Sequence, residues 1–352
     1  MALPTSHKPD ASSAETEARY TFRLLRAGRF KLDGGSMFGL IPRIVWSRNV
    51  APDERGRITV QHNCLLLERV GDGPHAPGSA RRVLIETGSG DKLDPKMREI
   101  FDLENRSILT SLAEINVAPE SIDAVVVSHL HFDHAGGLTR LCRDGETPDW
   151  LGDDGGGGST ARGGCKLTFP NAAVYVQQRE WRDALANRSV MTKTYYPDHL
   201  LPIEKQVRLI DSGRPFITGY VPDRDELPAI PVDMRESSLW PGSGLTVFNV
   251  PGHTWGQQAI KFREPGAAEV PGGRGRTIVF TPDVMPTAAH VGAAYSLGYD
   301  VEPYTSMVSR RWFLTEAAER DWVLCLDHEP GHPLFRVRAN AKAWFDLVPE
   351  PV

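Results

Sequence analysis

Runs of apolar, often β-branched residues recur through both halves of the chain and predict β-strands. Residues 122–127, for example, read Ile-Asp-Ala-Val-Val-Val, which is typical of a strand buried in a core. Arg82 to Gly88 predicts a strand that ends in a tight turn. The predicted strands span residues 20–30, 58–70, 82–88, 122–127, 172–177, 245–250, 258–262, 277–280 and 322–326.

Helical spacing of apolar positions appears between these strands. The predicted helices span residues 95–116, 179–187, 306–320 and 338–347. Because strands and helices alternate in both halves, the economical architecture is an α/β sandwich of αββα type. Two sheets would pack face to face, with helices on both outer faces.

Other segments lack a regular pattern. Residues 1–18 predict a disordered leader, and residues 19–352 predict a single domain. The Gly-rich segment 143–164 predicts a mobile surface insertion, and residues 188–243 predict irregular structure with short helices. The loop 31–42 carries Met37 and Phe38 among glycines, and two interpretations stay open: a hairpin connection packed on the core, or a flexible apolar lip over a pocket.

Composition narrows the class of protein. The 352-residue chain carries a net charge of −5 with no basic block, which argues against nucleic-acid binding. No run reaches the length of a membrane span, and no apolar signal segment begins the chain. Four cysteines without a C-x-x-C fit a reducing compartment, so we expect a cytoplasmic protein.

The densest cluster of candidate metal ligands directly follows the strand at 122–127. His129, His131, Asp133 and His134 lie within six positions, on a loop that leads into the predicted first turn of a helix. Imidazole and carboxylate are the ligand types for zinc, iron or manganese. Four such groups at this spacing make a purely structural role improbable.

Three further candidates each follow a predicted strand. His253, Asp283 and His328 would each be weak evidence alone. With the cluster above they supply five histidines and two aspartates, which is a ligand count for two adjacent divalent ions.

These residues carry a resemblance to a known family. The motif His129-x-His131-x-Asp133-His134, followed by His253, Asp283 and His328, resembles the metallo-β-lactamase-fold hydrolase superfamily over about residues 20–347. Shorter stretches at 35–39, 169–172, 282–287 and 298–300 resemble one branch, the N-acyl-homoserine-lactone lactonase-like and methyl-parathion-hydrolase-like enzymes.

The resemblance implies two mixed sheets and a division of the ligands. His129, His131 and His253 would bind one ion, Asp133, His134 and His328 the other, and Asp283 would bridge them. Two cations about 3.5–4 Å apart hold a shared hydroxide at neutral pH, which opens a lactone or ester. Asp133 would also act catalytically by positioning or shuttling a proton.

Two positions depart from the family pattern. Glu86 stands in a turn that is usually Asp-Thr-Gly, and Pro286 stands where lactonases of the best-known type carry a tyrosine that hydrogen-bonds the carbonyl. The negative charge that develops on the carbonyl oxygen would then be stabilised by the metal alone or by another residue. The candidates for that role are Tyr195, Tyr196, Tyr220, His290 and Tyr299.

Other catalytic classes fit less well. His328 to His332 matches H-E-x-x-H, but Pro330 and Gly331 would break the helix that a zinc peptidase needs, so His332 is not expected to be a ligand. No Gly-x-Ser-x-Gly appears, which argues against a serine hydrolase.

The sequence thus predicts a dinuclear hydrolase of a lactone, such as an acyl-homoserine lactone in quorum quenching, or of a related small ester. A phosphotriesterase or arylesterase on the same metals is the alternative, and an iron-dependent oxidoreductase of the same fold is less favoured. Zinc is the first choice of metal, with iron, manganese or cobalt as alternatives.

We expect Met37, Phe38, Trp255 and His290 to contact a small-molecule substrate, and we expect no nucleic-acid or membrane partner. A homodimer is a further expectation if the loop 37–41 or the segment 188–243 exposes an apolar patch.

Overall fold

The computed structural model describes residues 18–71, 80–152, 164–190, 194–214, 235–342 and 344–352. The expected leader therefore lies almost entirely outside the described residues, as does the middle of the Gly-rich insertion.

The first sheet has six strands and is mixed. Its order is β1-β2-β3-β4-β7-β8. The pairs β1–β2 and β2–β3 are antiparallel, whereas β3, β4, β7 and β8 run parallel to one another. The strands are β1 Arg19–Asp33, β2 Arg57–Val70, β3 Arg82–Ile85, β4 Ala124–Val126, β7 Ala173–Gln177 and β8 Val207–Ile210.

The second sheet has seven strands in the order β15-β14-β13-β12-β11-β10-β9. Only β12 and β13 pair in parallel; the other neighbours are antiparallel. The strands are β9 Ser237–Ser238, β10 Thr246–Asn249, β11 Gln258–Arg263, β12 Thr277–Thr281, β13 Val323–Leu326, β14 Leu334–Ala339 and β15 Phe345–Pro349.

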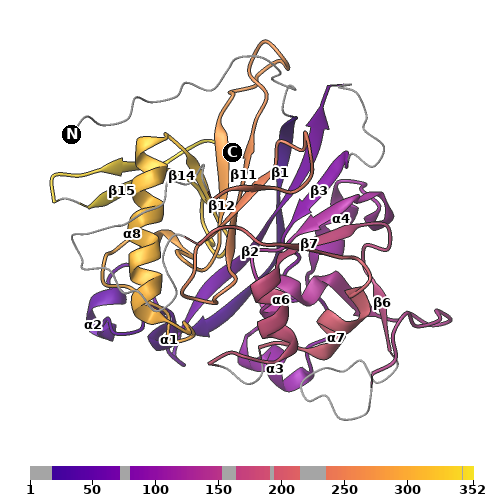
Figure 1. The fold of residues 1–352 in the computed structure, drawn as a ribbon. Coiled ribbons are helices and arrows are strands. Elements are labelled where there is room, and N and C mark those ends of the chain that lie inside the picture. The colour runs from indigo at the N-terminus through magenta and orange to yellow at the C-terminus, as the bar shows by residue number, and fades with distance from the viewer. Residues whose placement is uncertain (1–17, 72–79, 153–163, 191–193, 215–234, 343) are drawn as a thin grey trace, which may run out of the picture.

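Helices cover the outer faces of the sandwich (Figure 1). The long helix α8 lies on the side of the second sheet, and α4, α6 and α7 lie on the side of the first. The helices are α1 Gly34–Phe38, α2 Arg43–Trp46, α3 Pro95–Ile100, α4 Ile108–Glu114, α5 Phe132–Ala135, α6 Gln178–Leu185, α7 Pro197–Leu200 and α8 Pro303–Glu319. Short 3₁₀ turns cover Pro119–Ser121, Gly136–Leu138, Leu201–Ile203 and Ala288–His290.

Alternation along the strands explains the layers. In β4, Val126 packs between the sheets, whereas Val125 packs outward against α4 and α6. In β12, Ile278 and Phe280 face the first sheet, whereas Val279 packs beneath α8. Because successive side chains of a strand point to opposite faces, a strand covered on both sides is apolar throughout. The predicted αββα sandwich of two mixed sheets is therefore confirmed.

Two helix predictions need correction. The helix expected at 338–347 is wrong: β14 and β15 form an antiparallel hairpin there. The side chain of Asn340 accepts hydrogen bonds from the backbone of Lys342 and Trp344, so a local turn replaces helical bonding. The helix expected at 95–116 is two short helices, α3 and α4, separated by a turn at Asp102, which has a φ of 46°.

The structure has several short strands that the sequence did not predict. The segment 188–243 contributes α7 but also the edge strands β8 and β9. Thr139–Leu141 and Cys165–Leu167 pair as β5 and β6, so the Gly-rich insertion extends from a hairpin. Short edge strands carry little periodicity because only a few residues pair.

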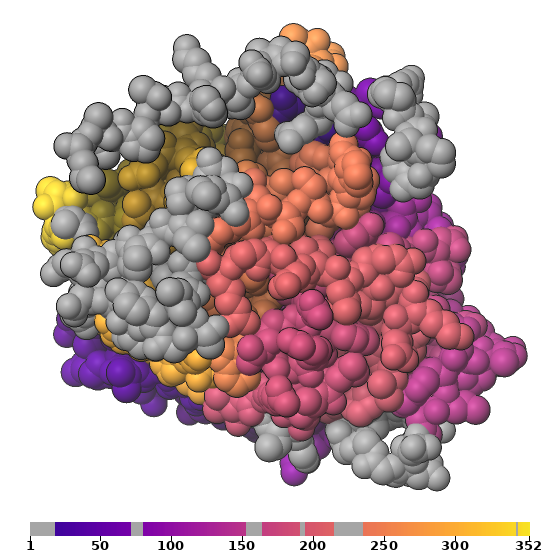
Figure 2. All heavy atoms as spheres, viewed as in Figure 1, coloured from indigo at the N-terminus to yellow at the C-terminus, as the bar shows by residue number. Residues whose placement is uncertain are grey.

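The loop after β1 folds as α1 and α2. Met37 and Phe38 are each 1% exposed and pack with Trp46 and Leu297, whereas Leu40 is 85% exposed. The backbone N–H of Gly298 donates to the carbonyl of Ser36 at 2.7 Å. In the space-filling view this violet segment lies at the lower left, beside orange residues of the C-terminal half (Figure 2). The first interpretation, a connection packed on the core, thus describes Met37 and Phe38.

In the part of the chain that the structure describes, no helix combines the length and apolar character that crossing a membrane requires.

Candidate metal centre

The predicted ligands converge at one edge of the sandwich, where strands of both sheets end. His129 and His131 follow β4, and His253 follows β10. Asp283 and His328 follow the parallel pair β12 and β13. All of these side chains are buried, so their placement is set by packing from both halves of the chain.

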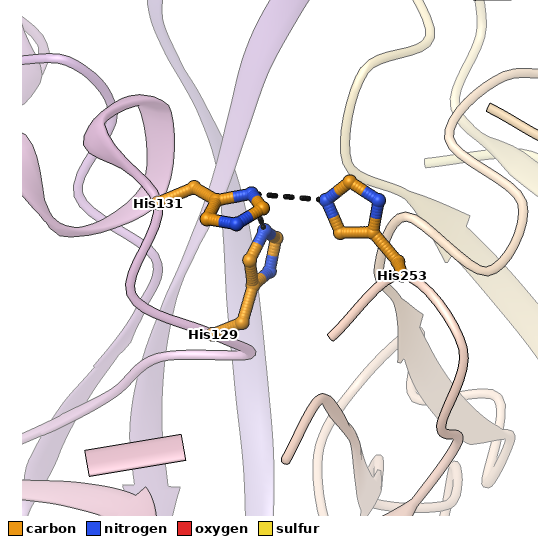
Figure 3. A group of neighbouring side chains, drawn as sticks. All are labelled: His129, His131 and His253. Carbon is orange, nitrogen blue, oxygen red and sulfur yellow. Dashed lines mark hydrogen bonds between the residues drawn. The ribbon is translucent and has the colours of Figure 1, made fainter. Parts of the chain in front are cut away.

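Three histidines form the first cluster. Nδ1 of His131 lies 3.1 Å from Nε2 of His129 and 3.0 Å from Nε2 of His253. Figure 3 shows the rings of His129 and His131 reaching from the first half of the chain and that of His253 from the second. Three imidazoles turned toward one another with their nitrogens this close form the donor set of a divalent metal.

A second cluster lies beside the first. His134, Asp283, Asp327 and His328 bring one ligand atom each to within 4.8 Å of one another. Asp133 approaches the same two histidines, with Oδ1 3.8 Å from Nε2 of His134 and Oδ2 3.6 Å from Nε2 of His328. Two imidazoles and several carboxylates again suit a divalent ion.

Asp283 lies between the clusters. Its Oδ2 is 3.0 Å from Nε2 of His253 and 4.0 Å from Nε2 of His129 in the first cluster. Its Oδ1 is 3.4 Å from Nε2 of His328, and Oδ2 is 3.9 Å from Nε2 of His134, in the second. One carboxylate thus reaches both groups of imidazoles, as a bridging ligand must.

Outer contacts orient two of the imidazoles. Nδ1 of His328 lies 3.0 Å from the carbonyl of Gln61, and Nδ1 of His253 lies 2.9 Å from Oδ1 of Asp300. Since a carbonyl or carboxylate only accepts, both Nδ1 atoms carry the proton and donate it. The lone pair of each neutral ring is then on Nε2, which faces the cluster, and this is the usual arrangement of metal-ligating histidines.

Glu86 anchors the loop that carries the first ligands. Its Oε1 accepts the backbone N–H of Ser128 at 2.6 Å, and its Oε2 lies 3.3 Å from Nδ1 of His134. The residue has a φ of 65°, an uncommon conformation for a side chain larger than glycine. The longer side chain that departs from the family pattern is therefore accommodated, and it fixes both ends of the ligand loop.

Glu180 of α6 links the loops of the two sheets. It accepts the backbone N–H of Leu130 and the hydroxyls of Tyr195 and Thr254 at 3.0, 3.1 and 2.6 Å. Leu130 separates two ligands of the first sheet, and Thr254 follows the ligand of the second. A Cβ at Gly256 would lie 2.3 Å from the nitrogen of Glu180, so only glycine lets the second loop approach this closely.

The pKa values of the histidines diverge. Burial and the neighbouring imidazoles hold the pKa of His129 and of His131 well below the usual range. Burial also disfavours charge at His253, but Asp283 and Asp300 outweigh it and raise its pKa to about 10. At His134, Asp133 and Glu86 likewise outweigh burial and raise the pKa to about 9. The carboxylates thus favour positive charge on His253 and His134. A bound metal ion would supply this positive charge in place of the imidazole protons.

Buried polar atoms without hydrogen-bond partners indicate whether a cation would fit between the ligands of the two clusters. Oδ1 of Asp283 and both oxygens of Asp327 have no hydrogen-bond partner among the described residues. Burying such groups without partners is costly, and a cation between them would remove that cost. The residues present therefore fit two divalent ions.

The predicted substrate-binding residues lie elsewhere or are already bonded. Met37 and Phe38 are core side chains, and His290 is buried, with Nε2 2.8 Å from the carbonyl of Met37 and Nδ1 2.8 Å from Oγ1 of Thr287. Trp255 is partly exposed, donates to Glu302 and lies under the guanidinium of Arg179. Only Trp255 of these four presents surface, and its contact with a substrate stays a prediction.

The tyrosines that could stabilise the oxyanion differ in whether their hydroxyl groups are already hydrogen-bonded. The hydroxyl of Tyr195 donates to Glu180, and Tyr299 hydrogen-bonds Ser36. Tyr220 lies outside the described residues. Tyr196 is buried between Phe132 and His199, and its hydroxyl has no partner among the described residues.

Sequence reasoning missed Asp327. The residue directly precedes His328 at the end of a predicted strand, the same signal that identified Asp283. His332, by contrast, lies 2.5 Å from the carbonyl of Glu350 through Nε2 and takes no part in either cluster. The segment around Glu329 is not helical, which agrees with rejecting the peptidase motif.

Comparison with known proteins decides the family. The model of the metallo-beta-lactamase superfamily matches residues 57–267, which is more than half of the chain. The chain belongs to this superfamily. Membership supports a metal-dependent hydrolase, and it confirms the resemblance seen in the sequence.

Solved structures share the fold at low sequence identity. A probable metal-dependent hydrolase from Staphylococcus aureus has a TM-score of 0.67 and 22% identity, covering 96% of this chain and 99% of its own. AidC, a dizinc quorum-quenching lactonase, has a TM-score of 0.62 and 16% identity over the same shares. The hydrolase AbOPH has a TM-score of 0.61 and 17% identity, covering 97% and 99%. A comparison with curated protein sequences gave no match.

Proposed function

We propose that this protein is a dinuclear metal-dependent hydrolase that opens a lactone, with acyl-homoserine lactones favoured, or cleaves a related small ester. The placement of Asp283 carries the proposal, because its two oxygens reach the imidazoles of both clusters. The similar fold of a dizinc quorum-quenching lactonase supports the substrate class.

Two divalent ions held here would supply an activated water at neutral pH and polarise the carbonyl oxygen of the ester. The chain's own part is to place and move the proton. Asp133 is the most suitable group, since its carboxylate lies at the edge of the second cluster and is 8% exposed. Oδ1 or Oδ2 of Asp133 would accept the proton of the attacking water and return it to the departing alkoxide.

The buried hydroxyl of Tyr196 is the best-placed donor for the carbonyl oxygen. It is the one tyrosine candidate within the described residues whose hydroxyl makes no hydrogen bond, and its ring packs against Phe132, which adjoins Asp133. It would replace the tyrosine that Pro286 excludes, since a hydrogen bond to developing negative charge lowers the barrier.

Zinc is the proposed metal, with iron, manganese or cobalt as alternatives, because histidine with carboxylate accepts all of them. The proposed partner is a small molecule only, in a cytoplasmic setting. A homodimer is also proposed, because Leu40 and Ile44 both expose apolar side chains in the α1–α2 segment.

A phosphotriesterase-like or arylesterase activity is the second candidate. Proline at 286 removes the side chain that would tie the site to an acyl carbonyl, and the backbone carbonyl of Pro286 accepts the N–H of His328 instead. A phosphoryl oxygen could be polarised by the same pair of ions.

A substrate panel tests both candidates. Protein loaded with zinc, manganese or cobalt would be assayed on short- and long-chain acyl-homoserine lactones, an aryl ester and a phosphotriester. We expect the highest kcat/KM on a lactone and its loss in Asp133→Asn, with Asp144→Asn, at an exposed position, as the matched control. Turnover of the phosphotriester alone would favour the second candidate, and no turnover of any ester by metal-replete protein would refute both.

A further inference from the structure

Asp327 is a buried carboxylate whose two oxygens receive no hydrogen bond from the described residues. It is 1% exposed. No ion pair with a basic side chain of the described chain involves it either. A buried carboxylate in this state is strongly destabilised unless a cation or a proton compensates it.

The backbone fixes where this carboxylate lies. The N–H of Asp327 donates to the carbonyl of Thr281 at 3.2 Å, and its carbonyl accepts the N–H of Asn63 at 2.8 Å. The residue is thus held between β12 and β2, and its side chain cannot turn to solvent. The amide of Asn63 could have served as a donor, but its Nδ2 donates to the carbonyls of Leu326 and Glu329.

The carboxylate faces the second cluster. One oxygen of Asp327 lies within 4.8 Å of ligand atoms of His134, Asp283 and His328. Asp283, within that distance, is another carboxylate. Two ionised carboxylates repel at this distance, so the pair requires a positive charge between or beside them.

We propose that Asp327 is a further ligand of the second metal position, beside His134, Asp283 and His328. The inference rests on the proposed two-metal site, and it concerns which residues hold the ion rather than which substrate is cleaved. Asp133, which approaches the same two histidines, is then less constrained as a ligand and freer to handle a proton.

The two positions become chemically unequal as a result. The first is surrounded by three imidazoles and the shared carboxylate, whereas the second has two imidazoles and up to three carboxylates. Oxygen ligands favour harder ions such as Mn²⁺, and imidazole suits Zn²⁺. The second position should therefore discriminate less strongly against Mn²⁺ than the first.

Asp327→Asn tests the proposal without reference to activity, with Asp144→Asn as the matched control. Metal-free proteins would be titrated with Zn²⁺ against a chromophoric chelator, which counts the bound ions and gives both affinities. We expect the first affinity to be unchanged and the second to fall roughly tenfold or more in Asp327→Asn, with no change in the control. An unchanged second affinity would overturn the proposal, as expected if Asp283 and Asp327 merely share a proton.

Thermal unfolding with and without zinc supplies an independent readout. Removing a buried carboxylate that receives no hydrogen bond should leave metal-free Asp327→Asn at least as stable as the metal-free parent, while the gain in Tm on adding zinc should shrink. A purely structural aspartate predicts the opposite, namely a less stable or unfolded variant without metal, and that result would also overturn the proposal. Failure of the substrate panel alone would leave both readouts intact and so would refute the proposed function only.

Discussion

Individual side chains around the clusters hold each imidazole in one orientation. Asp300 accepts from Nδ1 of His253 and also, through Oδ2, from the backbone N–H of Leu297. The carboxylate is therefore itself fixed, and it both selects the tautomer of His253 and increases the basicity of the nitrogen that faces the cluster.

Replacing Asp300 with asparagine should weaken the first metal position. An amide can still accept from Nδ1 but contributes no charge, so we expect metal affinity there to fall by about 10- to 100-fold. A chelator competition that counts bound ions would measure it. An unchanged affinity would show that the contact with His253 is not coupled to metal binding.

Metal binding should release protons in a pH-dependent way. His134 and His253 have pKa values raised to about 9 and 10 without metal, above the usual 6.5, so both are protonated near pH 7.5. The stability that these charges give the metal-free protein is fully present below pH 6.5 and is lost as pH rises through 9 and 10.

Calorimetry in buffers of different ionisation enthalpy should therefore detect about two protons released per chain on zinc binding near neutral pH. Apparent affinity should rise with pH up to about 10 and then level off. Binding without proton release would contradict the assigned protonation.

Tyr196→Phe should separate catalysis from structure. If its hydroxyl stabilises the reacting carbonyl, kcat should fall by about 100-fold or more, with metal content and Tm almost unchanged. Tyr195→Phe is the contrasting variant, because it removes a hydrogen bond to Glu180 and should lower metal retention instead. A wild-type kcat for Tyr196→Phe would exclude the role.

At the scale of elements, short loops at strand ends carry the ligands, and helix α6 joins loops of the two sheets through Glu180. The approach of the loop after β10 to α6 leaves no space for a side chain at Gly256. Local geometry thus depends on a contact between segments about 75 residues apart, Glu180 and Gly256.

Gly256→Ala should consequently displace this loop together with His253. We expect a loss of about 1–3 kcal/mol of stability and weaker metal binding at the first position, because the Cβ meets backbone that cannot move freely. Gly266→Ala is the control, since a Cβ there meets only a flexible carboxylate at 3.7 Å. Equal unfolding curves for the two variants would contradict the close approach.

At the scale of the whole molecule, the site joins the two sheets at one edge of the sandwich. The core between the sheets is apolar and continuous, and the edge where the ligands meet is polar and buried. Stability and metal binding are therefore linked, because the clusters assemble only when both sheets are packed.

Chelation should lower the Tm by an amount that depends on metal concentration. Ions that bind only the folded state stabilise it by RT ln(1 + [L]/Kd), which is about 2.7 kcal/mol at a hundredfold excess over Kd. Differential scanning calorimetry at several free-zinc concentrations would test this. A Tm independent of zinc would mean that the clusters do not hold the metal in the folded protein.

The amino-acid sequence alone determined most strands of the core and the sandwich, and it singled out seven candidate ligands. Long apolar runs and the dense spacing of His129 to His134 are local signals, so they can be read without coordinates. The same reasoning failed at 338–347, where a turn at Asn340 and pairing with β14 outweighed helical spacing.

Only the tertiary structure decided which groups meet. Asp327, Glu180 and Asp300 lack a distinctive local pattern, and they matter because strands and loops distant in sequence bring them to the clusters. Met37, Phe38 and His290 resembled pocket residues in sequence, yet packing buried the first two and bonded the third on both nitrogens. Local pattern encodes chemical type and periodicity, whereas distances between side chains depend on packing across the whole chain.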